Sequence, residues 1–333
     1  MSQKHIFITG ATGYLGQVLT EHAIAKGHTV RGLSRSESKD ANLTRLGATP
    51  VRGSLETLDI LRAESARADI IMHLADPLLD PGSGFNTPYD KVLAIDAAAV
   101  DAMVAGLAEG TSQSSGSPGD GDEKKTLITT SGTMMAAPDP NGDETSEDGP
   151  VNLSSPITRY KAWDHARTAA AKAGGGVRAL CVRLAPFVYG RGGSGVRMFM
   201  EGASAAGAAT YVDGGKTRTT TVHVDDAARL YLLVADKGRA GEAYNASAET
   251  GVTMRELQGA IAEVLGVPAV DLSKEEAMAK MPPFLVHFLV VENRGSNKKA
   301  VTELGWQPSQ PGIVEDILRG SYVDVAKSLG KGK

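Results

Sequence analysis

Short apolar runs alternate with longer amphipathic stretches over the first 190 residues of the chain. The apolar runs are HIFITG, HTVRGLS, TPVRG, ADIIMHLA, KTLITTSG and VRALCVRLAPFVYG, and each has the length of a buried strand. Helical patterns lie between them, at residues 17–26, TLDILRAES and DKVLAIDAAAVDAMVAGLAEG, and from about residue 156 to 173. Strands and helices that alternate in this way predict an α/β fold with right-handed crossovers and a doubly wound parallel sheet.

The pattern changes after Gly190, where RGGSG opens a glycine-rich stretch followed by several short elements. We predict that residues 1–190 form the main domain and that residues 219–247 return to it with a strand and a helix, which Asp225 or Asp226 caps. Residues 191–218 and 248–333 are then a smaller C-terminal substrate-binding lobe. Residues 111–125, TSQSSGSPGDGDEKK, have the composition of a flexible insertion, and APDPNGDETSEDGP that of an acidic loop after a strand.

Composition and charge exclude several classes of protein. The chain has 333 residues, 41% of them hydrophobic, and a formal net charge of −4, which suits a globular protein of one large or two coupled domains. Its basic residues form no concentrated face apart from a short KSLGKGK tail, so we expect no nucleic-acid partner. The seven histidines show no metal-ligand spacing, and we predict no metal site.

Three features indicate a cytoplasmic protein without a membrane segment. The single cysteine, Cys181, lies in the apolar run VRALCVRL, where it is predicted to be a buried strand residue that forms no disulfide. The N-terminus enters a strand almost at once, which leaves no room for a signal peptide. The apolar run FLVHFLVV is shorter than the roughly 20 residues that span a bilayer. We expect that this run either lines a substrate pocket or forms a helix in the core or in a homodimer contact.

A glycine-rich turn follows the first predicted strand. In ITGATGYLGQVL, Gly10, Gly13 and Gly16 lie between that strand and a helix. Such glycines permit a sharp turn, a close approach of the backbone to a pyrophosphate, and tight packing of helix on strand. The N-terminus of the helix would then hold the phosphates. The spacing and its position in the chain predict a dinucleotide cofactor.

The end of the second strand predicts which dinucleotide is bound. An acidic residue there would hold the ribose 2′-hydroxyl of NAD, whereas this chain has Ser34 and Arg35 in RGLSRSES. A hydroxyl and a guanidinium suit a 2′-phosphate, so we predict NADP(H). The alternative is that Arg35 is a solvated surface charge and that Glu37 takes the role of the acid.

Taken together, TGATGYLG, ADIIMHLA, TTSG, VRLAPFVYG, VHVDDAARLYLL and ELGWQP resemble the short-chain dehydrogenase/reductase superfamily, in its extended, epimerase/dehydratase-like branch. The resemblance covers nearly the whole chain and implies a Rossmann fold. It also implies a Ser–Tyr–Lys–Asn active site: Ser131 would hydrogen-bond the substrate carbonyl, and Lys161 would bind the nicotinamide ribose and lower the pKa of the tyrosine. Asp96 matches the position of the asparagine. Further expected cofactor contacts are Thr12, Tyr14, Leu15, Ser54, Leu55, Leu74, Ala75, Thr130, Pro186, Phe187 and Val188.

The expected tyrosine is missing. It should lie four residues before Lys161, one helical turn away on the same face, but Ile157 stands there. Ser155 and Pro156 make a good helix start, which would put Ile157 in the first turn. Tyr160 is adjacent to the lysine and would point about 100° away from it in a regular helix. It is our candidate proton donor only if the helix register slips, in which case Tyr160 and Asp164 form the one-turn pair.

Four further residues, Thr133, Arg159, Tyr189 and Arg191, are candidates to face the substrate. Tyr189 could equally be a packed aromatic side chain, and His223 is predicted to be structural. The sequence shows no basic cluster that would clamp a sugar diphosphate. We therefore predict an NADP(H)-dependent oxidoreductase that reduces a ketone or aldehyde of a small, apolar molecule. Two alternatives stay open: an epimerase or dehydratase without net cofactor turnover, and a non-catalytic NADPH-binding sensor.

Overall fold

The computed structural model describes residues 2–79, 87–113, 124–155 and 157–330. The chain divides into two compact units, each built from three segments of the chain. Unit 1 contains residues 1–131, 153–183 and 228–244, and unit 2 contains residues 132–152, 184–227 and 245–333. This division differs from the predicted one, because residues 132–152 and 184–190 belong to unit 2 and the segment that returns to unit 1 is shorter.

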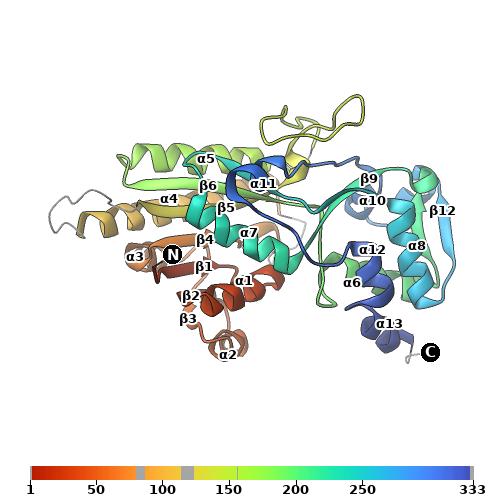
Figure 1. Ribbon diagram of the computed structural model, residues 1–333, viewed down its shortest axis with the longest axis horizontal. Helices are drawn as coiled ribbons and strands as arrows, with labels where there is room; N and C mark the ends of the chain where they lie inside the picture. The colour runs from red at the N-terminus through yellow and green to blue at the C-terminus, as the bar shows by residue number, and fades with distance from the viewer. Residues whose placement is uncertain (1, 80–86, 114–123, 156, 331–333) are drawn as a thin grey trace. The chain divides into compact units, whose positions relative to one another are not determined.

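A parallel sheet of seven strands runs through unit 1 in the order β10-β6-β5-β4-β1-β2-β3 (Figure 1). The strands are β1 His5–Thr9, β2 Thr29–Ser34, β3 Thr49–Arg52, β4 Ile70–His73, β5 Lys125–Gly132, β6 Val177–Leu184 and β10 Ala243–Ala246. Ile6 pairs with Val30 on one side and with Ile70 on the other, so the strand order reverses at β1. This is the predicted doubly wound Rossmann sheet, and ligands bind such sheets at the carboxyl ends of the strands beside the reversal.

Helices cover both faces of the sheet, with α4 and α5 over one face and α1 on the other (Figure 1). Their bounds are α1 Tyr14–Ala25, α2 Glu37–Arg45, α3 Leu58–Arg67, α4 Tyr89–Gln113, α5 Arg159–Lys172 and α7 Val224–Lys237. Helix α4 packs tightly on α3 because Gly106 leaves room for the α3 backbone: a Cβ there would lie 2.2 Å from the Arg62 carbonyl oxygen. The strand interiors are buried on both faces, as parallel sheets require.

Unit 2 is assembled from shorter elements around its own apolar core. A three-stranded sheet joins β7 Phe187–Tyr189, β9 Arg218–His223 and β11 Glu249–Thr253, and a parallel pair joins β8 Ala209–Val212 to β12 Ala269–Leu272. The helices are α6 Ser194–Ala206, α8 Met254–Leu265, α9 Lys274–Lys280, α10 Pro283–Val290, α11 Lys298–Leu304, α12 Ile313–Arg319 and α13 Val323–Gly330. Helix α8 begins at a reciprocal capping box between Thr253 and Glu256.

Four element predictions were wrong in detail. Helix α5 begins at Arg159 rather than at residue 156, and the predicted strand 177–190 is two strands separated at Ala185 and Pro186. Helix α4 continues to Gln113, into the predicted insertion, of which residues 114–123 lie outside the described part of the chain. Asp225 and Asp226 lie inside the first turn of α7, so neither caps it.

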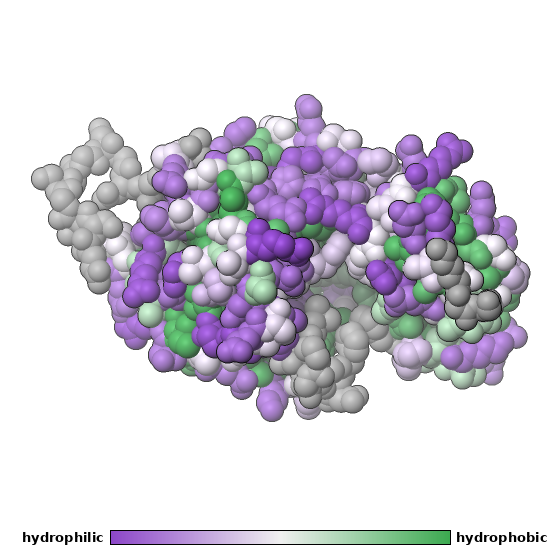
Figure 2. All heavy atoms as spheres, turned by 90° about the horizontal axis from the view of Figure 1, so that it is seen from below, coloured by the Kyte–Doolittle hydropathy of each residue, from purple (hydrophilic) through white to green (hydrophobic). Residues whose placement is uncertain are grey.

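Hydrophilic residues cover most of the face drawn in Figure 2, and hydrophobic residues gather there in small groups. The large hydrophobic side chains that are exposed are scattered along the chain: Leu58, Val151, Leu153, Met198, Met278 and Val301. Within the residues described, no helix is both long enough and apolar enough to cross a membrane. Cys181 is fully buried in β6 and unpaired, as predicted, and burial raises the pKa of its thiol.

Candidate active site

The glycine-rich turn between β1 and α1 has the geometry that the sequence predicts. Gly10 has φ +74°, and a Cβ there would lie 2.8 Å from the Ala75 amide nitrogen, so only glycine fits. A Cβ on Gly16 would lie 2.1 Å from the Gly10 carbonyl oxygen, which holds α1 close against the turn. Gly13 is the N-cap of α1 and supplies no capping side chain.

This turn fits the pyrophosphate of a dinucleotide. The uncapped helix N-terminus presents backbone N–H groups and the positive end of the helix dipole, and the glycines keep side chains away from them. Thr12 and Tyr14 are half-buried at the turn, and Leu15 is buried behind it. On this observation the chain can hold a nicotinamide dinucleotide, which supplies or accepts the hydride when bound.

Two residues that the sequence analysis missed, Asp40 of α2 and Arg52 of β3, lie beside the carboxyl end of β2. Ser34 is buried, and its hydroxyl oxygen lies 3.1 Å from the Ser36 carbonyl oxygen. Arg52, which pairs with Ser34 in the β2–β3 register, forms an ion pair with Asp40 of α2. A hydrogen bond from Ser34, with help from Arg52, holds the pKa of Asp40 below its usual value. Arg35 is exposed beside them. No sequence pattern links Asp40 and Arg52 to Ser34. The position of helix α2 and the pairing of β2 with β3 bring these residues together only in the folded protein.

Other predicted cofactor contacts lie at the carboxyl ends of β3 and β4. Ser54 and Thr57 close a tight turn after β3, with the Ser54 amide donating to Thr57 Oγ1 (2.9 Å), and Leu55 is buried within it. After β4, the Leu74 amide donates to the Thr9 carbonyl oxygen (3.1 Å), and the Ala75 amide donates to Thr9 Oγ1 (3.3 Å). These bonds place the start of the β4–α4 loop directly against the glycine-rich turn.

A buried polar chain continues from Thr9 through the ends of β4 and α4. Thr9 Oγ1 bonds His73 Nδ1 (2.7 Å), and His73 Nε2 bonds Asp96 Oδ1 (3.2 Å), with all three residues buried. Burial pushes the pKa of Asp96 upward, but the hydrogen bond and charge of His73, together with the charge of Arg159, outweigh burial and lower it. Asp96 is therefore a carboxylate that is held ionised in the interior.

Arg159, the first residue of α5, brings a cation to the same place. Its Nη2 donates to the Thr130 carbonyl oxygen (2.7 Å), and its Nη1 lies 3.3 Å from Asp76 and 3.8 Å from Asp96. Only 13% of its side chain is exposed, so the guanidinium is held inside by two carboxylates. The Thr130 hydroxyl is itself used within the protein, between the His73 carbonyl oxygen (2.8 Å) and the Tyr231 hydroxyl (2.7 Å).

Tyr89, the first residue of α4, adds a phenol that the sequence analysis did not single out. Its hydroxyl is buried within reach of the Arg159 guanidinium, and it completes no hydrogen bond to any other described residue. Burial raises the pKa of Tyr89 to about 12, Arg159 acts against that rise, and Asp76 and Asp96 add to it. No motif marks this residue, because its role depends on the packing of α4 beside α5.

The predicted catalytic residues of α5 lie elsewhere than their sequence register suggests. Ile157 precedes the helix, where its amide and carbonyl groups are both within 3.2 Å of the Ser155 hydroxyl, so Ser155 closes a turn and does not cap α5. Pro156 lies outside the described residues. Lys161 is exposed and Tyr160 is half-buried in the first turn of α5. Ser131 is buried near the end of β5, as expected for a residue at the carboxyl edge.

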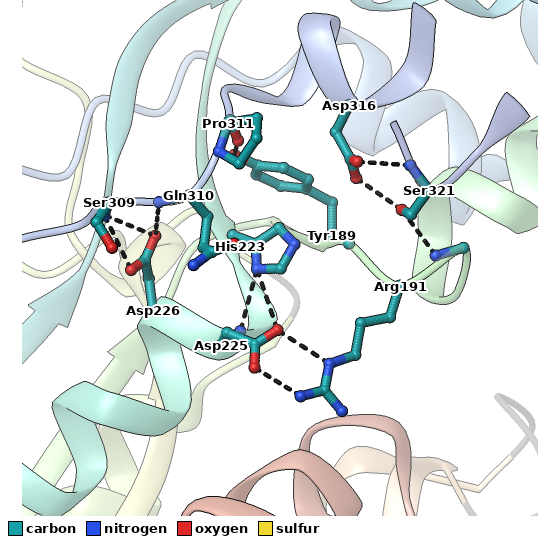
Figure 3. Close-up of polar contacts among 12 residues, drawn as sticks. Tyr189, Arg191, His223, Asp225, Asp226, Ser309, Gln310, Pro311, Asp316 and Ser321 are labelled. Atoms are coloured by element: carbon teal, nitrogen blue, oxygen red, sulfur yellow. Dashed lines mark hydrogen bonds and ion pairs between the residues drawn. The ribbon is translucent and has the colours of Figure 1, made fainter. Parts of the chain in front are cut away.

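In unit 2, the predicted substrate residues are committed to internal contacts (Figure 3). Tyr189 is buried, donates its hydroxyl to the Pro311 carbonyl oxygen (2.6 Å) and packs edge-on against the His223 ring. Arg191, in a left-handed conformation with φ +50°, forms a two-pronged ion pair with Asp225 (2.6 and 2.9 Å). Burial raises the pKa of Tyr189, and the bond to Pro311 occupies its hydroxyl proton, so Tyr189 is a packed aromatic residue.

The other predicted site residues of unit 2 also make contacts within the unit. Thr133 is buried, and its hydroxyl donates to Asn293 Oδ1 (2.8 Å). Phe187 is buried in the core of unit 2 against Phe199, between the half-buried Pro186 and Val188. Within the described ranges, no three His, Cys, Asp or Glu side chains come together as ligands of a metal ion.

Comparisons with known proteins agree with this fold. An uncharacterised protein of Schizosaccharomyces pombe is 33% identical over 318 residues, 95% of this chain and 99% of that protein. The 4-hydroxy-2-methyl-3-oxo-4-farnesyl-3,4-dihydroquinoline-1-oxide ketoreductase of Stigmatella aurantiaca is 28% identical over 273 residues, 79% of this chain and 75% of that protein. The crystal structure of UDP-glucose 4-epimerase from Thermotoga maritima, with UDP-glucose, superimposes with a TM-score of 0.75 at 20% identity, covering 97% of this chain and 99% of that one.

The sequence model described as the NAD dependent epimerase/dehydratase family matches residues 6–247, from the first strand of the sheet to the end of its last. The predicted resemblance is thereby confirmed over most of the chain. With its seven-stranded sheet and its glycine-rich turn, this protein belongs to the NAD dependent epimerase/dehydratase family of the extended short-chain dehydrogenase/reductase type.

Proposed function

We propose that the protein is an NADP(H)-dependent reductase that converts a ketone or aldehyde of a small, apolar molecule to the alcohol. The observation that carries the proposal is the carboxyl edge of β4 and β5, where Arg159 donates to the carbonyl oxygen of Thr130, the residue before Ser131, and the Tyr89 hydroxyl is buried beside Arg159. Hydroxyl and guanidinium donors are suited to a carbonyl oxygen that gains negative charge during hydride transfer. The relationship to a ketoreductase of Stigmatella aurantiaca supports the same reaction class.

The preference for NADP(H) is supported by charge at the end of β2. Arg35 follows Ser34 in the sequence, Arg52 pairs with Ser34 in the β2–β3 register, and Asp40 is already paired with Arg52. Together, Arg35, Lys39 and Arg52 against Glu37 and Asp40 leave a net charge of +1 where the adenosine ribose is expected. A guanidinium can bind a phosphate through two hydrogen bonds, whereas the 2′-hydroxyl of NAD would be better matched by a free carboxylate.

A sugar-nucleotide epimerase is less well supported by the same structure. Such a substrate carries a diphosphate and needs free cationic donors. In the described part of unit 2, Arg191 is paired with Asp225, Arg218 with Glu292, and Arg294 with the carbonyl oxygens of Gly142 and Thr250. The energy needed to release them would oppose diphosphate binding.

The chain's own residues would act in the following way. The turn at Gly10 and the N-terminus of α1 hold the pyrophosphate, and Arg35 and Ser34 hold the 2′-phosphate. Ser131 donates a hydrogen bond to the substrate carbonyl oxygen and orients it. Holding the reactants in this geometry contributes a large part of such a rate, and a proton donor adds about 10²–10⁴-fold. The fold thus supplies binding, orientation and charge stabilisation.

The test is NADPH oxidation by the purified protein, followed at 340 nm with a panel of benzaldehyde, cyclohexanone, 2,3-butanedione and phenylglyoxal. We expect turnover with at least one substrate and a fall of about 10²-fold or more in kcat for Ser131→Ala, because an oxyanion donor is lost. Arg167→Gln, an exposed residue on α5, is the matched control and should keep the parent rate.

Two results would replace this proposal. Tight NADPH binding without oxidation of the cofactor by any carbonyl compound would favour a sensor. Conversion of a substrate to its epimer or dehydration product, with no net change in NADPH, would favour an epimerase or dehydratase. Binding of NADPH is measured separately by fluorescence titration, so that loss of cofactor binding is distinguished from loss of chemistry.

A further inference from the structure

Two neighbouring polar groups in unit 1 are buried without a hydrogen-bond partner among the described residues. They are the Tyr89 hydroxyl, at the start of α4, and Nη1 of Arg159, at the start of α5, although Nη1 also lies 3.3 Å from Asp76 in an ion pair. Leaving a buried hydroxyl without a complete hydrogen bond costs about 1–3 kcal/mol, and such groups are rare in native proteins. The Tyr89 hydroxyl beside the guanidinium therefore indicates that a ligand atom completes its hydrogen bonding.

The position of the pair in the fold indicates which ligand. Arg159 Nη2 donates to the carbonyl oxygen of Thr130, the residue immediately before Ser131. Asp76, the ion-pair partner of Arg159, directly follows Ala75, which contacts Gly10 of the glycine-rich turn. The phenol and the guanidinium therefore lie at the carboxyl edge of β4 and β5, between the expected pyrophosphate site and the serine that would bind the carbonyl.

We propose that Tyr89 is the catalytic proton donor of the reductase and that Arg159 is a positioning residue that stabilises the tyrosinate. This inference rests on the proposed reductase function and names its acid. In this arrangement, a phenol and a cation from two different helices perform the step for which Ile157 leaves no acid on α5.

The chemistry balances in one step. The carbonyl carbon of the substrate accepts a hydride, the electron pair of the C=O π bond moves to oxygen, and that oxygen takes the phenolic proton of Tyr89. The tyrosinate that remains faces the fixed charge of Arg159 and regains a proton from water. Each turnover thus consumes one reduced cofactor and one solvent proton and releases the alcohol.

The charges around Tyr89 suit an acid rather than a base. Burial, Asp76 and Asp96 favour the neutral phenol, whereas Arg159 favours the anion, and burial dominates, so the pKa of about 12 keeps the proton in place at neutral pH. His73 faces the same cluster through its bond to Asp96. The guanidinium becomes most stabilising after the proton has left, which is the charge distribution that general acid catalysis requires.

Three other tyrosines are less suitable. The Tyr231 hydroxyl is bound to Thr130 Oγ1 (2.7 Å), and the Tyr189 hydroxyl is bound to the Pro311 carbonyl oxygen (2.6 Å). Tyr160 is half-buried in the first turn of α5, next to the exposed Lys161. Tyr89 therefore combines a buried hydroxyl, a neighbouring cation and no complete hydrogen bond to another described residue.

The decisive variant is Tyr89→Phe. We expect kcat for the best carbonyl substrate to fall by about 10²–10⁴-fold, while the Kd for NADPH changes by less than about twofold. Its Tm should stay the same or rise, because the variant removes a buried hydroxyl that has no partner. The matched control is Tyr211→Phe in unit 2, whose hydroxyl only accepts a bond from Arg255 (3.2 Å), and its kcat should not change.

The role of Arg159 is tested by replacement with and without charge. Arg159→Gln should lower kcat and also Tm, because it leaves Asp76 and Asp96 without their cation. Arg159→Lys keeps the charge and should recover a large part of kcat, a rescue that a purely steric role would not give. Tyr160→Phe and Lys161→Gln are measured beside them as the alternative acid and cation.

The outcomes separate the two proposals. If the parent protein oxidises NADPH with none of the carbonyl compounds, the reductase proposal fails and this inference fails with it. If the parent turns over and Tyr89→Phe keeps the full rate, only this inference is overturned. A Tm several degrees lower for Tyr89→Phe, or a loss of kcat confined to Tyr160→Phe, overturns it as well.

Discussion

Asp96 illustrates how single residues set the electrostatics of this site. The carboxylate is only 3% exposed, yet His73 and Arg159 keep its pKa below the ordinary value. Burying an unpaired charge would cost several kcal/mol, so the pairing is what allows a carboxylate at this depth. The sequence indicated Asp96 as a site residue, but it could not show which cation would balance it, because Arg159 is 63 positions away along the chain.

The low pKa of Asp96 predicts an acid-sensitive contribution to stability. A carboxyl group whose folded pKa is depressed contributes fully above its unfolded pKa of about 3.9, and the contribution is lost as the pH falls through the folded value. Asp96→Asn should lower the free energy of unfolding at pH 7 by about 3–5 kcal/mol, because it breaks a buried pair. Urea unfolding measured between pH 7 and pH 3 should also show a flatter decline below about pH 4 in the variant. Identical acid slopes for parent and variant would show that Asp96 is not held ionised.

Arg35 provides a second prediction at the residue scale, from the proposed preference for NADP(H). Arg35→Ala should weaken NADPH binding by about 10–100-fold, because a hydrogen bond to a charged group is worth about 1.5–3 kcal/mol, while NADH binding stays the same. Fluorescence titration with both cofactors measures the ratio. Arg45→Ala, in the last turn of α2, is the control. An equal loss of affinity for the two cofactors would contradict a 2′-phosphate contact.

At the scale of elements, packing decides where helices begin and how closely they approach. The sequence predicted α1 at residues 17–26, close to its observed bounds Tyr14–Ala25, because the strand before the glycine-rich turn and the helical pattern after it agree with the glycine spacing. It placed the start of α5 too early, since Ser155 and Pro156 resemble a helix start, whereas the Ser155 hydroxyl bonds Ile157 and α5 begins at Arg159. Tyr160 and Lys161 therefore lie in the first turn of α5, and Ile157 lies before the helix.

The close contact between α1 and the glycine-rich turn can be tested with one methyl group. Gly16→Ala would put a Cβ 2.1 Å from the Gly10 carbonyl oxygen, so the backbone has to move. We expect a loss of about 1–3 kcal/mol in stability and at least about tenfold weaker NADPH binding. Gly259→Ala in α8 is the control, because a Cβ there has no neighbour within 4 Å, and it should raise stability by about 0.5–1 kcal/mol. A Gly16→Ala protein that keeps both properties would mean that the turn is not tightly packed.

At the scale of the whole molecule, each of the two units is built from segments that are far apart in the sequence. Unit 1 needs residues 228–244, which arrive after a long passage through unit 2. Those residues bring Tyr231, which is fully buried, and the Ala235 and Gly238 carbonyl oxygens, which accept hydrogen bonds from Arg178. The sequence predicted that a strand and a helix return to the main domain here. It gave the returning segment the bounds 219–247, whereas the segment in unit 1 is 228–244.

This interleaving predicts that unit 1 cannot be separated by truncation. A chain that ends after Arg183 would lack β10 at one edge of the sheet and would leave the Arg178 guanidinium without its carbonyl partners. We expect such a fragment to show no cooperative urea transition by circular dichroism, whereas the full chain unfolds cooperatively. A fragment that unfolds cooperatively and binds NADPH would show that residues 228–244 are dispensable.

The sequence by itself determined the doubly wound sheet and the glycine-rich turn, because these follow from local signals: hydrophobic period, glycine spacing and strand ends. The family resemblance added Ser131 and Asp96 as expected site residues. Only the tertiary structure decided that Arg159 is the buried cation, that Tyr89 faces it, and that Asp40 and Arg52 meet beside Ser34. These side chains are brought together by the packing of α4 beside α5 and by the pairing of β2 with β3. Contacts between residues far apart in sequence leave no periodic trace along the chain, so their chemistry becomes visible only after folding.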